Sequence, residues 1–399
     1  MSPTAPLLDA VGTAYPFFDS AVLADLVGRE VVPSGLRHKP GVSTTATLTT
    51  PDGTPWGWAQ VLRGEQADKV ANARRRAAAR RSVVTVRPLP DRAGVLLHGR
   101  VGSDPRLHRG LEELAALLPD VDAALRAGAL LPLRYNALRR LVVRGGEEAG
   151  PVPADRVVRI GAERRTLSLT ALERLADLGV PLLAPDRSAV IAPTRHVTVW
   201  PWVTGSDLAA APDRDAAHAA GAALARLHEV TTSRDGRRAM SRVLAGEGPE
   251  PALRRVVSSV AAVAPSLTPR LDDIVRRLGR LAWRPDRIVH GDFSADQVVV
   301  GREGIRIVDL DRLQLGEPLH DLAGFAAVEL RRTGHWGLTP ELLSGYRRRV
   351  DPAALTAWTA HALLLRLTEP FRAVSPTWRQ DMDERMDEVE VVLREGVVP

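Results

Sequence analysis

Four side chains that could share one metal ion lie close together in the last third of the sequence. Asp292 and Gln297 belong to the stretch HGDFSADQ, and Asp309 and Asp311 belong to the stretch VDLDR that follows. Carboxylate and amide oxygens are hard ligands, which Mg²⁺ binds together with water and phosphate oxygens. The residues therefore indicate an ion site for a phosphate-bearing cofactor. The alternative interpretation is that they are ordinary turn residues that cap an acidic hairpin.

The elements that must position these side chains are two short apolar runs. VVV and IRIV flank the turn sequence GREG, an arrangement typical of a β-hairpin. A hairpin returns Asp309 to the end at which the loop with Asp292 and Gln297 lies. The sequence thus predicts that two or three carboxylates and one amide carbonyl gather at one end of a hairpin.

The front of the chain shows strand patterns and the rear shows helical ones. Strands are expected over 36–63 around the turn PDG, and a similar order of strand, turn, strand and helix begins again near 133 as a weak repeat. Apolar residues at three- and four-residue spacing indicate a helix in DPRLHRGLEELAALL. Further helices are predicted over 213–230 and 320–396. We expect an α+β fold with a small antiparallel sheet and a mostly helical rear.

The composition is that of a soluble globular protein without disulfide bonds. Of its 399 residues, 45% are hydrophobic and 26% are charged, and there is no cysteine. The length favours two or three units. The lack of cysteine excludes disulfide bridges, thiolate zinc sites and cysteine nucleophiles. We find no signal-peptide pattern and no apolar run long enough to span a membrane, so we expect a cytoplasmic protein without a membrane partner.

The net charge of +6 gives only weak support for a nucleic-acid partner. Lys39 and Lys69 are the lysines of the chain, so nearly all positive charge comes from arginine, a bias typical of a GC-rich genome. The basic run ARRRAAARR (73–81) could bind an anionic surface, but a solvated helix face interrupted by alanine is the simpler interpretation. Aromatic residues make up 4% of the chain, which argues against a base-stacking platform. No nucleic-acid partner is predicted.

Two motifs in the same region carry a family resemblance. HGDFSADQ resembles the H-x-D-x-x-x-x-N motif of the aminoglycoside phosphotransferase and choline-kinase-like family, which is similar to protein kinases. GEPLHDLA resembles the G-x-P-x-x-D-L-A ending of the same family. The resemblance covers about 131–399 and is most specific over 288–323. It implies a bilobal, protein-kinase-like α+β fold that uses ATP and Mg²⁺.

The resemblance also implies a role for each acidic residue of the motifs. Asp292 matches the catalytic base that accepts the proton of the acceptor hydroxyl. Gln297 stands where the family usually has an asparagine that binds metal, and Asp309 matches the aspartate that holds Mg²⁺ between the phosphates of ATP. Asp311 is expected to assist Asp309. Asp321 is expected to brace the loop rather than to take part in the chemistry.

The nucleotide side departs from the family pattern. The strand RVVRIG places Arg159 where the family has a phosphate-binding lysine, and arginine can pair with phosphate in a bidentate way. In the family a glutamate pairs with that lysine. The nearest candidates for this glutamate in the present sequence are Glu163 and Glu173. The stretch VTVWPWVTGSDL resembles the segment that binds adenine. There the Pro201 carbonyl and the Trp202 N–H would hydrogen bond to the base, although core packing is an equal alternative for such a tryptophan.

The resemblance further suggests how the chain is divided. We predict an N-terminal cap domain over 1–130, a nucleotide-binding N-lobe over 131–203 and a helical C-lobe over 204–399. Maltokinases and glucosamine kinases of the same fold carry such a cap and also resemble this chain in using glutamine at the metal position. In the front unit Gln60 stands at the place of the lysine, so this unit resembles a non-catalytic relative of a nucleotide lobe.

The function implied is a Mg-ATP-dependent kinase for a hydroxyl group of a small molecule, such as a sugar, aminosugar or aminoglycoside. A peptide-directed kinase of a natural-product pathway is one alternative, and a degenerate, nucleotide-binding pseudokinase is the other. The acceptor and the oligomeric state are not readable from the sequence. Four acidic residues of the rear could attract a cationic acceptor, although a solvated helix face is the favoured interpretation: Glu369, Asp381, Asp383 and Glu384. Three aromatic residues could line the acceptor side or pack the helical core: Trp358, Phe371 and Trp378.

Overall fold

The structure is a computed structural model, and it divides into two compact units. It describes residues 12–64, 66–90, 94–127, 132–144, 155–163, 169–183, 194, 196–234, 236, 243–279 and 281–397. Unit 1 comprises Met1–Arg165, Pro185–Trp202 and Glu369–Arg379, and unit 2 comprises Thr166–Ala184, Val203–Thr368 and Gln380–Pro399. The division into 1–130, 131–203 and 204–399 stays a prediction.

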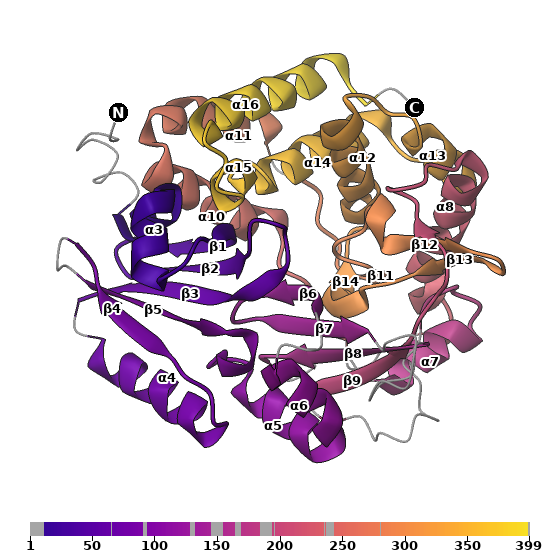
Figure 1. The fold of residues 1–399 in the computed structure, drawn as a ribbon. Helices are drawn as coiled ribbons and strands as arrows, with labels where there is room; N and C mark the ends of the chain where they lie inside the picture. The colour runs from indigo at the N-terminus through magenta and orange to yellow at the C-terminus, as the bar shows by residue number, and fades with distance from the viewer. Residues whose placement is uncertain are drawn as a thin grey trace. The chain divides into compact units, whose positions relative to one another are not determined.

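Unit 1 contains two antiparallel sheets (Figure 1). The first has the order β1-β2-β3-β5-β4 and the second the order β6-β7-β8-β9. The strands of the first sheet are β1 (Val32–Lys39), β2 (Ser43–Thr49), β3 (Pro55–Arg63), β4 (Thr85–Pro88) and β5 (Gly94–Arg100). Those of the second are β6 (Pro132–Asn136), β7 (Arg140–Arg144), β8 (Arg156–Gly161) and β9 (Val197–Pro201). The helices are α2 (Tyr15–Phe18), α3 (Ser20–Val27), α4 (Ala67–Ala79), α5 (His108–Leu117), α6 (Pro119–Ala127) and α15 (Glu369–Arg372).

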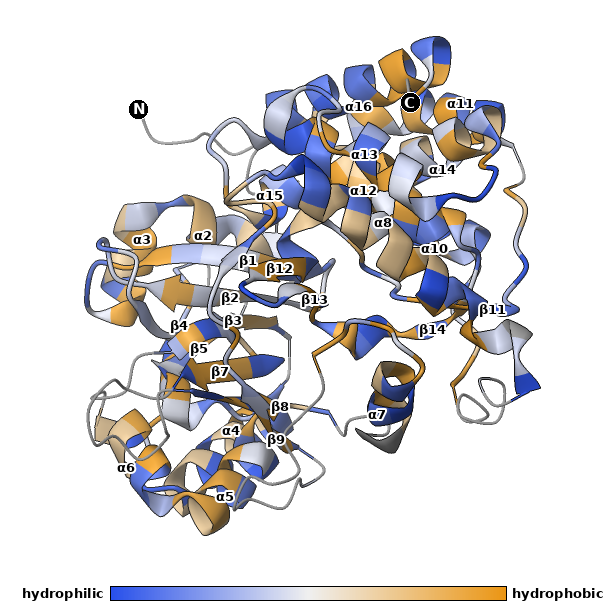
Figure 2. Cartoon of the chain, turned by 90° about the vertical axis from the view of Figure 1, so that its right-hand side faces the viewer, coloured by the Kyte–Doolittle hydropathy of each residue, from blue (hydrophilic) through white to orange (hydrophobic). Residues whose placement is uncertain are grey.

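One hydrophobic core joins the two sheets of unit 1. Trp58 on β3 and Val158 on β8 are fully buried in the same cluster, together with Leu111 on α5. In Figure 2, α5 and α6 each carry both hydrophobic and hydrophilic residues. This is expected of amphipathic helices that pack one face against a sheet. A buried carboxylate adds a polar link, because Asp104 accepts hydrogen bonds from the Tyr135 hydroxyl at 2.7 Å and the Leu138 N–H at 2.8 Å.

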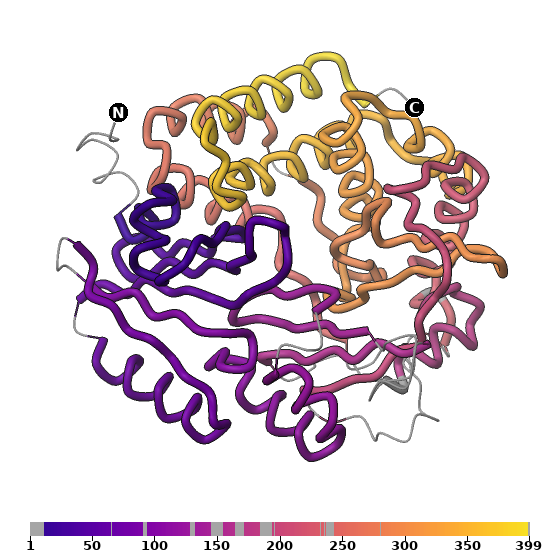
Figure 3. The backbone as a smooth tube through the Cα atoms, in the orientation of Figure 1, coloured from indigo at the N-terminus to yellow at the C-terminus, as the bar shows by residue number. Residues whose placement is uncertain are grey.

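A short segment near the C-terminus belongs to unit 1. The Phe371 ring lies 5.3 Å from the Phe18 ring and 5.2 Å from the Trp378 ring, measured between centroids. Arg372 Nε donates to the Leu36 carbonyl at 3.3 Å. The tube in Figure 3 shows this late, yellow segment beside the indigo start of the chain. Phe371 and Trp378 therefore pack a core, which was one of their two predicted roles.

Unit 2 is mostly helical and holds the predicted hairpin. Its helices are α7 (Leu169–Asp177), α8 (Arg214–Glu229), α10 (Pro249–Val263), α11 (Thr268–Leu278), α12 (Leu319–Thr333), α13 (Thr339–Tyr346), α14 (Pro352–Leu365) and α16 (Trp378–Glu395), the first two residues of α16 being counted with unit 1. Its strands are β10 (Ser206–Asp207), β11 (Arg287–Val289), β12 (Val298–Gly301), β13 (Gly304–Ile307) and β14 (Gln314–Gly316). One small sheet has the order β10-β12-β13, and the other pairs β11 with β14.

The elements agree with the predicted α+β class. The strands around the PDG turn, the helices within 213–230 and 320–396 and the hairpin are all present. The sequence patterns missed α2, α3 and the true start of β1 at Val32. No described helix of this chain has the length and apolar character that a membrane span requires.

Two glycines allow α8 and α13 to pack with their backbones nearly in contact. A Cβ atom added to Gly221 on α8 would lie 1.9 Å from the Leu342 carbonyl oxygen, and one added to Gly345 on α13 would lie 1.8 Å from the His218 carbonyl oxygen. Both obstacles are backbone atoms, which cannot rotate away. The pair of helices therefore has no room for a side chain at either position.

We expect Gly221→Ala to lower the free energy of unfolding by about 2 kcal/mol, because overpacking outweighs the gain of about 1 kcal/mol in helix propensity. Urea denaturation measures the change. Gly102→Ala is the matched control, since a Cβ there would meet nothing closer than 3.7 Å. An unfolding free energy for Gly221→Ala equal to that of the unmodified protein would show that the two helices can separate at no cost.

Candidate functional site

The β12–β13 hairpin brings the two halves of the acidic motif to one end. Val298 pairs with Ile307, and Gly301 pairs with Gly304 at the turn. At the open end the Val308 N–H donates to the Gln297 carbonyl at 3.0 Å. Gln297 and the residue that precedes Asp309 are thus in direct contact. The predicted hairpin is confirmed.

Val308 also ties the hairpin to the loop that carries Asp292. Its carbonyl accepts a hydrogen bond from His290 Nε2 at 2.9 Å, so Nε2 carries the proton. His290 Nδ1 in turn accepts the Asp292 N–H at 3.3 Å, which suits this tautomer. The backbone of one residue therefore links the Gln297 turn and the Asp292 loop immediately before Asp309.

Asp309 has an unusual backbone conformation. Its φ of 58° and ψ of 46° place it in the left-handed region. Few residues other than glycine adopt this region, and such strain of about 1–3 kcal/mol persists only where the surroundings enforce it, often at functional sites. The conformation turns the chain directly after β13. This departure from strand geometry lies at the residue predicted to bind the metal ion.

A fully buried carboxylate holds the loop before Asp292. Asp321 accepts the His290 N–H at 2.6 Å and the Gly291 N–H at 2.8 Å on its two oxygens. It also accepts a bond from His228 Nε2 at 3.1 Å, while His228 Nδ1 accepts from the Tyr346 hydroxyl at 2.8 Å. The predicted bracing role of Asp321 is confirmed, and His228 supports it from α8.

The charge of Asp321 survives its burial. Burial by itself raises the pKa of this carboxyl group, but the hydrogen bond from His228, with His290 and His320 nearby, lowers the pKa below its usual range. Asp321 is therefore ionised at neutral pH. A carboxylate that accepts backbone N–H groups binds them more strongly than a neutral acceptor would.

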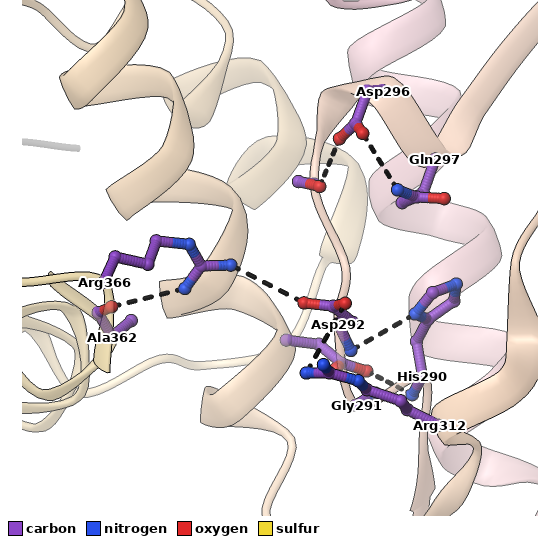
Figure 4. A network of polar contacts seen from close by, with 10 residues as sticks. His290, Gly291, Asp292, Asp296, Gln297, Arg312, Ala362 and Arg366 are labelled. Carbon is purple, nitrogen blue, oxygen red and sulfur yellow. Dashed lines mark hydrogen bonds and ion pairs between the residues drawn. The ribbon is translucent and has the colours of Figure 1, made fainter. Parts of the chain in front are cut away.

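Two arginines flank Asp292 (Figure 4). The carboxylate is 43% exposed, and its oxygens lie 3.5 Å from Arg312 Nη1 and 3.6 Å from Arg366 Nη2. Arg366 is itself anchored, because its Nη1 donates to the Ala362 carbonyl at 3.2 Å. The pairs hold the carboxylate in one orientation and leave an accessible side.

The sequence patterns did not single out either arginine. Arg312 follows the second acidic motif directly, so its position in VDLDR was a usable signal. Arg366 comes from the end of α14, and no local pattern connects it with Asp292. Its backbone is held in place, since its carbonyl accepts bonds from Arg331 Nη1 at 3.0 Å and Arg385 Nη1 at 2.7 Å.

The Gln297 amide is oriented so that its oxygen can act as a ligand. Its Nε2 donates to Asp296 at 2.9 Å, and Figure 4 shows its oxygen pointing away from that contact. Within the described part of the chain, no three His, Asp or Glu side chains are placed to hold a metal ion together. The binding of Mg²⁺ by Gln297, Asp309 and Asp311, with phosphates and water as the remaining ligands, stays a prediction.

Comparison with protein families decides the identity of this arrangement. Residues 133–364, more than half of the chain, match the phosphotransferase enzyme family. The chain belongs to this family. The match confirms the resemblance seen in the two motifs and, with it, the protein-kinase-like fold class. It also confirms that the predicted enzyme class is that of a phosphotransferase.

Several solved structures are similar to this phosphotransferase. A choline/ethanolamine kinase family protein from Mesorhizobium loti is 18% identical, with a TM-score of 0.47 over 72% of this chain and 95% of that chain. A choline kinase from Streptococcus pneumoniae is 13% identical, with a TM-score of 0.43 over 70% and 99%. A macrolide 2'-phosphotransferase from Brachybacterium faecium is 20% identical, with a TM-score of 0.39 over 70% and 98%. No curated protein sequence matches this chain.

The predicted nucleotide-binding residues of the phosphotransferase lie in unit 1. Arg159 on β8 is half-buried and pairs with Val142 and Thr198 on the neighbouring strands. Glu163, one of its two candidate partners, forms an exposed ion pair with Arg106 at 3.3 Å. The other candidate, Glu173, belongs to unit 2. The role of Arg159 in phosphate binding stays a prediction.

The segment predicted to bind adenine is the end of β9. The Trp202 N–H donates to the Asp155 carbonyl at 2.8 Å, and the Arg144 guanidinium lies 3.9 Å from the centre of the Trp202 ring. An adenine base that used this N–H would have to displace the Asp155 carbonyl. Pro201 pairs with Arg156 across the sheet. The adenine contacts of Pro201 and Trp202 stay predictions.

Two of the four acidic rear residues, Asp383 and Glu384, are exposed on α16, whereas Asp381 on α16 and Glu369 on α15 are half-buried. On α16, Asp383 contacts Arg270 Nη1 at 2.9 Å and Glu384 accepts from Gln380 at 2.8 Å. Arg270 also pairs with Asp387 and Glu390. For Asp383 and Glu384 this agrees with the favoured interpretation of a solvated surface. Trp358 is buried against Trp283, whose ring centroid lies 6.3 Å away.

Proposed function

We propose that this phosphotransferase moves the γ-phosphoryl group of Mg-ATP to a hydroxyl group of a small molecule, with a sugar, aminosugar or aminoglycoside as the first candidates. The observation that carries the proposal is the double hydrogen bonding of Val308. Its N–H holds the Gln297 turn and its carbonyl holds His290, so the Asp292 loop and Asp309 have one fixed relation.

Each residue of this site has a chemical task in the proposal. Asp292 accepts the proton of the attacking hydroxyl, since its carboxylate is accessible and is oriented by Arg312 and Arg366. Gln297 and Asp309 would hold Mg²⁺, and Asp311 would assist. A bound Mg²⁺ neutralises charge that develops on the phosphate oxygens. In unit 1, Arg159 would pair with phosphate, while Pro201 and Trp202 would hold the adenine base.

The proposal is tested by a screen with a built-in metal control. Pools of hydroxyl-bearing metabolites and of peptides are incubated with the protein and ATP, and ADP formation and phosphorylated products are measured with Mg²⁺ or with EDTA. We expect one small-molecule acceptor to be phosphorylated by ATP in the presence of Mg²⁺ and not in the presence of EDTA. A phosphorylated peptide in place of a small molecule would contradict the proposed acceptor class.

Nucleotide binding is expected to depend on Asp309. Mg-ATP at 100 times its Kd should stabilise the native protein by about 2.7 kcal/mol and raise its Tm. Asp309→Asn should lose most of this shift because it removes a charged metal ligand, and ATP with EDTA should give little shift. The exposed Asp272→Asn is the matched control and should keep the full shift. An unchanged Tm at millimolar Mg-ATP in the unmodified protein would show that the chain does not bind this nucleotide.

A further inference from the structure

A cavity on unit 1 is lined by residues that have no part in the proposed phosphoryl transfer. It lies where α4 meets α5 (Figure 1) and has a volume of about 320 Å³. This falls within the range of small-molecule sites, roughly 300–1,000 Å³. Its polar lining comes from Asn72, Arg75, Arg76, His108, Arg109 and Glu112.

The lining of this α4–α5 cavity is strongly basic. Three guanidinium groups face one carboxylate among the described residues that line it. That carboxylate, Glu112, contacts His108 Nε2 at 3.3 Å. One carboxylate cannot balance three guanidinium groups, so the described residues of the cavity wall carry an excess of positive charge.

Two of the arginines are held in place by contacts that leave their charge intact. Arg76 Nη1 donates to the Pro105 carbonyl at 2.7 Å, and Arg75 Nη2 donates to the Asn72 side-chain oxygen at 3.0 Å. Both partners are neutral. The guanidinium groups are therefore oriented in advance, which lowers the entropy cost of binding an anion.

The histidine of the cavity wall has an unmet hydrogen-bonding group. Within the described structure, His108 Nδ1 is buried and has no hydrogen-bond partner. Burial lowers the pKa of His108; Glu112 opposes this shift, and Arg76, Arg80 and Arg109 add to it. A bound anion would act against that lowering, because it favours the protonated ring. His108 and Arg109 also begin α5, whose N-terminal end adds positive potential.

We propose that the α4–α5 cavity binds a small anion of the phosphate-ester or polyphosphate class. Guanidinium groups pair with phosphate oxygens through two parallel hydrogen bonds, which suits several arginines around one concave site. No aromatic side chain is among the described residues of the lining, so stacking on a nucleic-acid base is not provided for. The basic run at 73–81 thus has two roles, since Arg80 is buried and pairs with Asp122 while Arg75 and Arg76 line the cavity.

The test uses the full chain with inorganic pyrophosphate as the probe. Binding is followed by calorimetry and by the NMR signals of the labelled histidine rings. We expect the pKa of His108 to rise in the presence of pyrophosphate. We expect Arg75→Ala and Arg109→Ala each to weaken binding about tenfold, as the loss of one charge-assisted hydrogen bond predicts. Both side chains are exposed, so the variants should fold.

Two control variants separate this site from others. Arg74→Ala removes an exposed arginine of α4 that does not line the cavity and should bind pyrophosphate as before. Asp309→Asn should leave the His108 response unchanged, because Asp309 belongs to the proposed phosphotransfer site. The proposal is overturned if no binding occurs at millimolar pyrophosphate, if Arg74→Ala weakens binding as much as Arg75→Ala, or if a single-stranded oligonucleotide shifts His108 and competes at far lower concentration.

Discussion

Asp292→Asn is expected to lower kcat by about 10²–10⁴-fold, the range that a general base contributes. The amide has nearly the shape of the carboxylate but cannot accept the proton of the acceptor hydroxyl. It also loses its charge interactions with Arg312 and Arg366, which lie 3.5 and 3.6 Å from the carboxylate. The KM for Mg-ATP should change little, since the proposed metal ligands are other residues.

The fold should survive this substitution. The Asp292 side chain is 43% exposed, so no buried charge is left without a partner. Ion pairs at such exposure contribute at most about 1 kcal/mol each. Steady-state kinetics with the acceptor found in the screen measure kcat, and thermal unfolding checks the fold. Asp286→Asn, which changes a carboxylate that is 67% exposed, is the control and should keep full activity. Full activity in Asp292→Asn would exclude the proposed base.

Asp321→Asn is expected to lower the free energy of unfolding by about 3–5 kcal/mol and to reduce kcat as well. A buried carboxylate that meets two N–H groups and a histidine is replaced by an amide whose NH₂ group faces one of those donors. Breaking a buried charged pair costs about this much. The loop that carries His290 and Gly291 loses its anchor, so Asp292 loses its fixed position.

The pH range of this effect follows from the lowered pKa of Asp321. A carboxyl group whose pKa is lower in the folded state stabilises the protein above its unfolded pKa, and that contribution is lost as pH falls through the folded pKa. The difference in unfolding free energy between Asp321→Asn and the unmodified protein should therefore reach its full size at neutral pH and shrink as the pH falls. Urea unfolding at pH 7 measures it.

His228→Gln is the matched comparison for Asp321→Asn, because the glutamine Nε2 can still donate to the carboxylate. Its effect on unfolding should be smaller than that of Asp321→Asn. If the unfolding free energy of Asp321→Asn lies within about 0.5 kcal/mol of that of the unmodified protein and kcat is unchanged, Asp321 is not what holds the loop that carries Asp292.

The hairpin of the site was predictable because its determinants are local. The turn GREG sets the register of β12 and β13, and the register alone brings Gln297 next to Val308. The proposed roles of Asp292 and Asp309 rest on a motif within one continuous stretch. The class of fold followed from the same stretch and from the order of strands and helices. The left-handed backbone of Asp309 was not predictable, since aspartate adopts this region more often than most residues but still in a minority of cases.

By itself, the sequence determined the hairpin, the acidic motif and the family, because these depend on residues that are neighbours along the chain. Only the tertiary structure decided which distant residues complete them. Arg366 reaches Asp292 from the end of α14, and Phe371 packs with Phe18 at the opposite end of the chain. The α4–α5 cavity likewise depends on how two helices meet. Side-chain partners of this kind are set by packing between elements, and no local spacing records them.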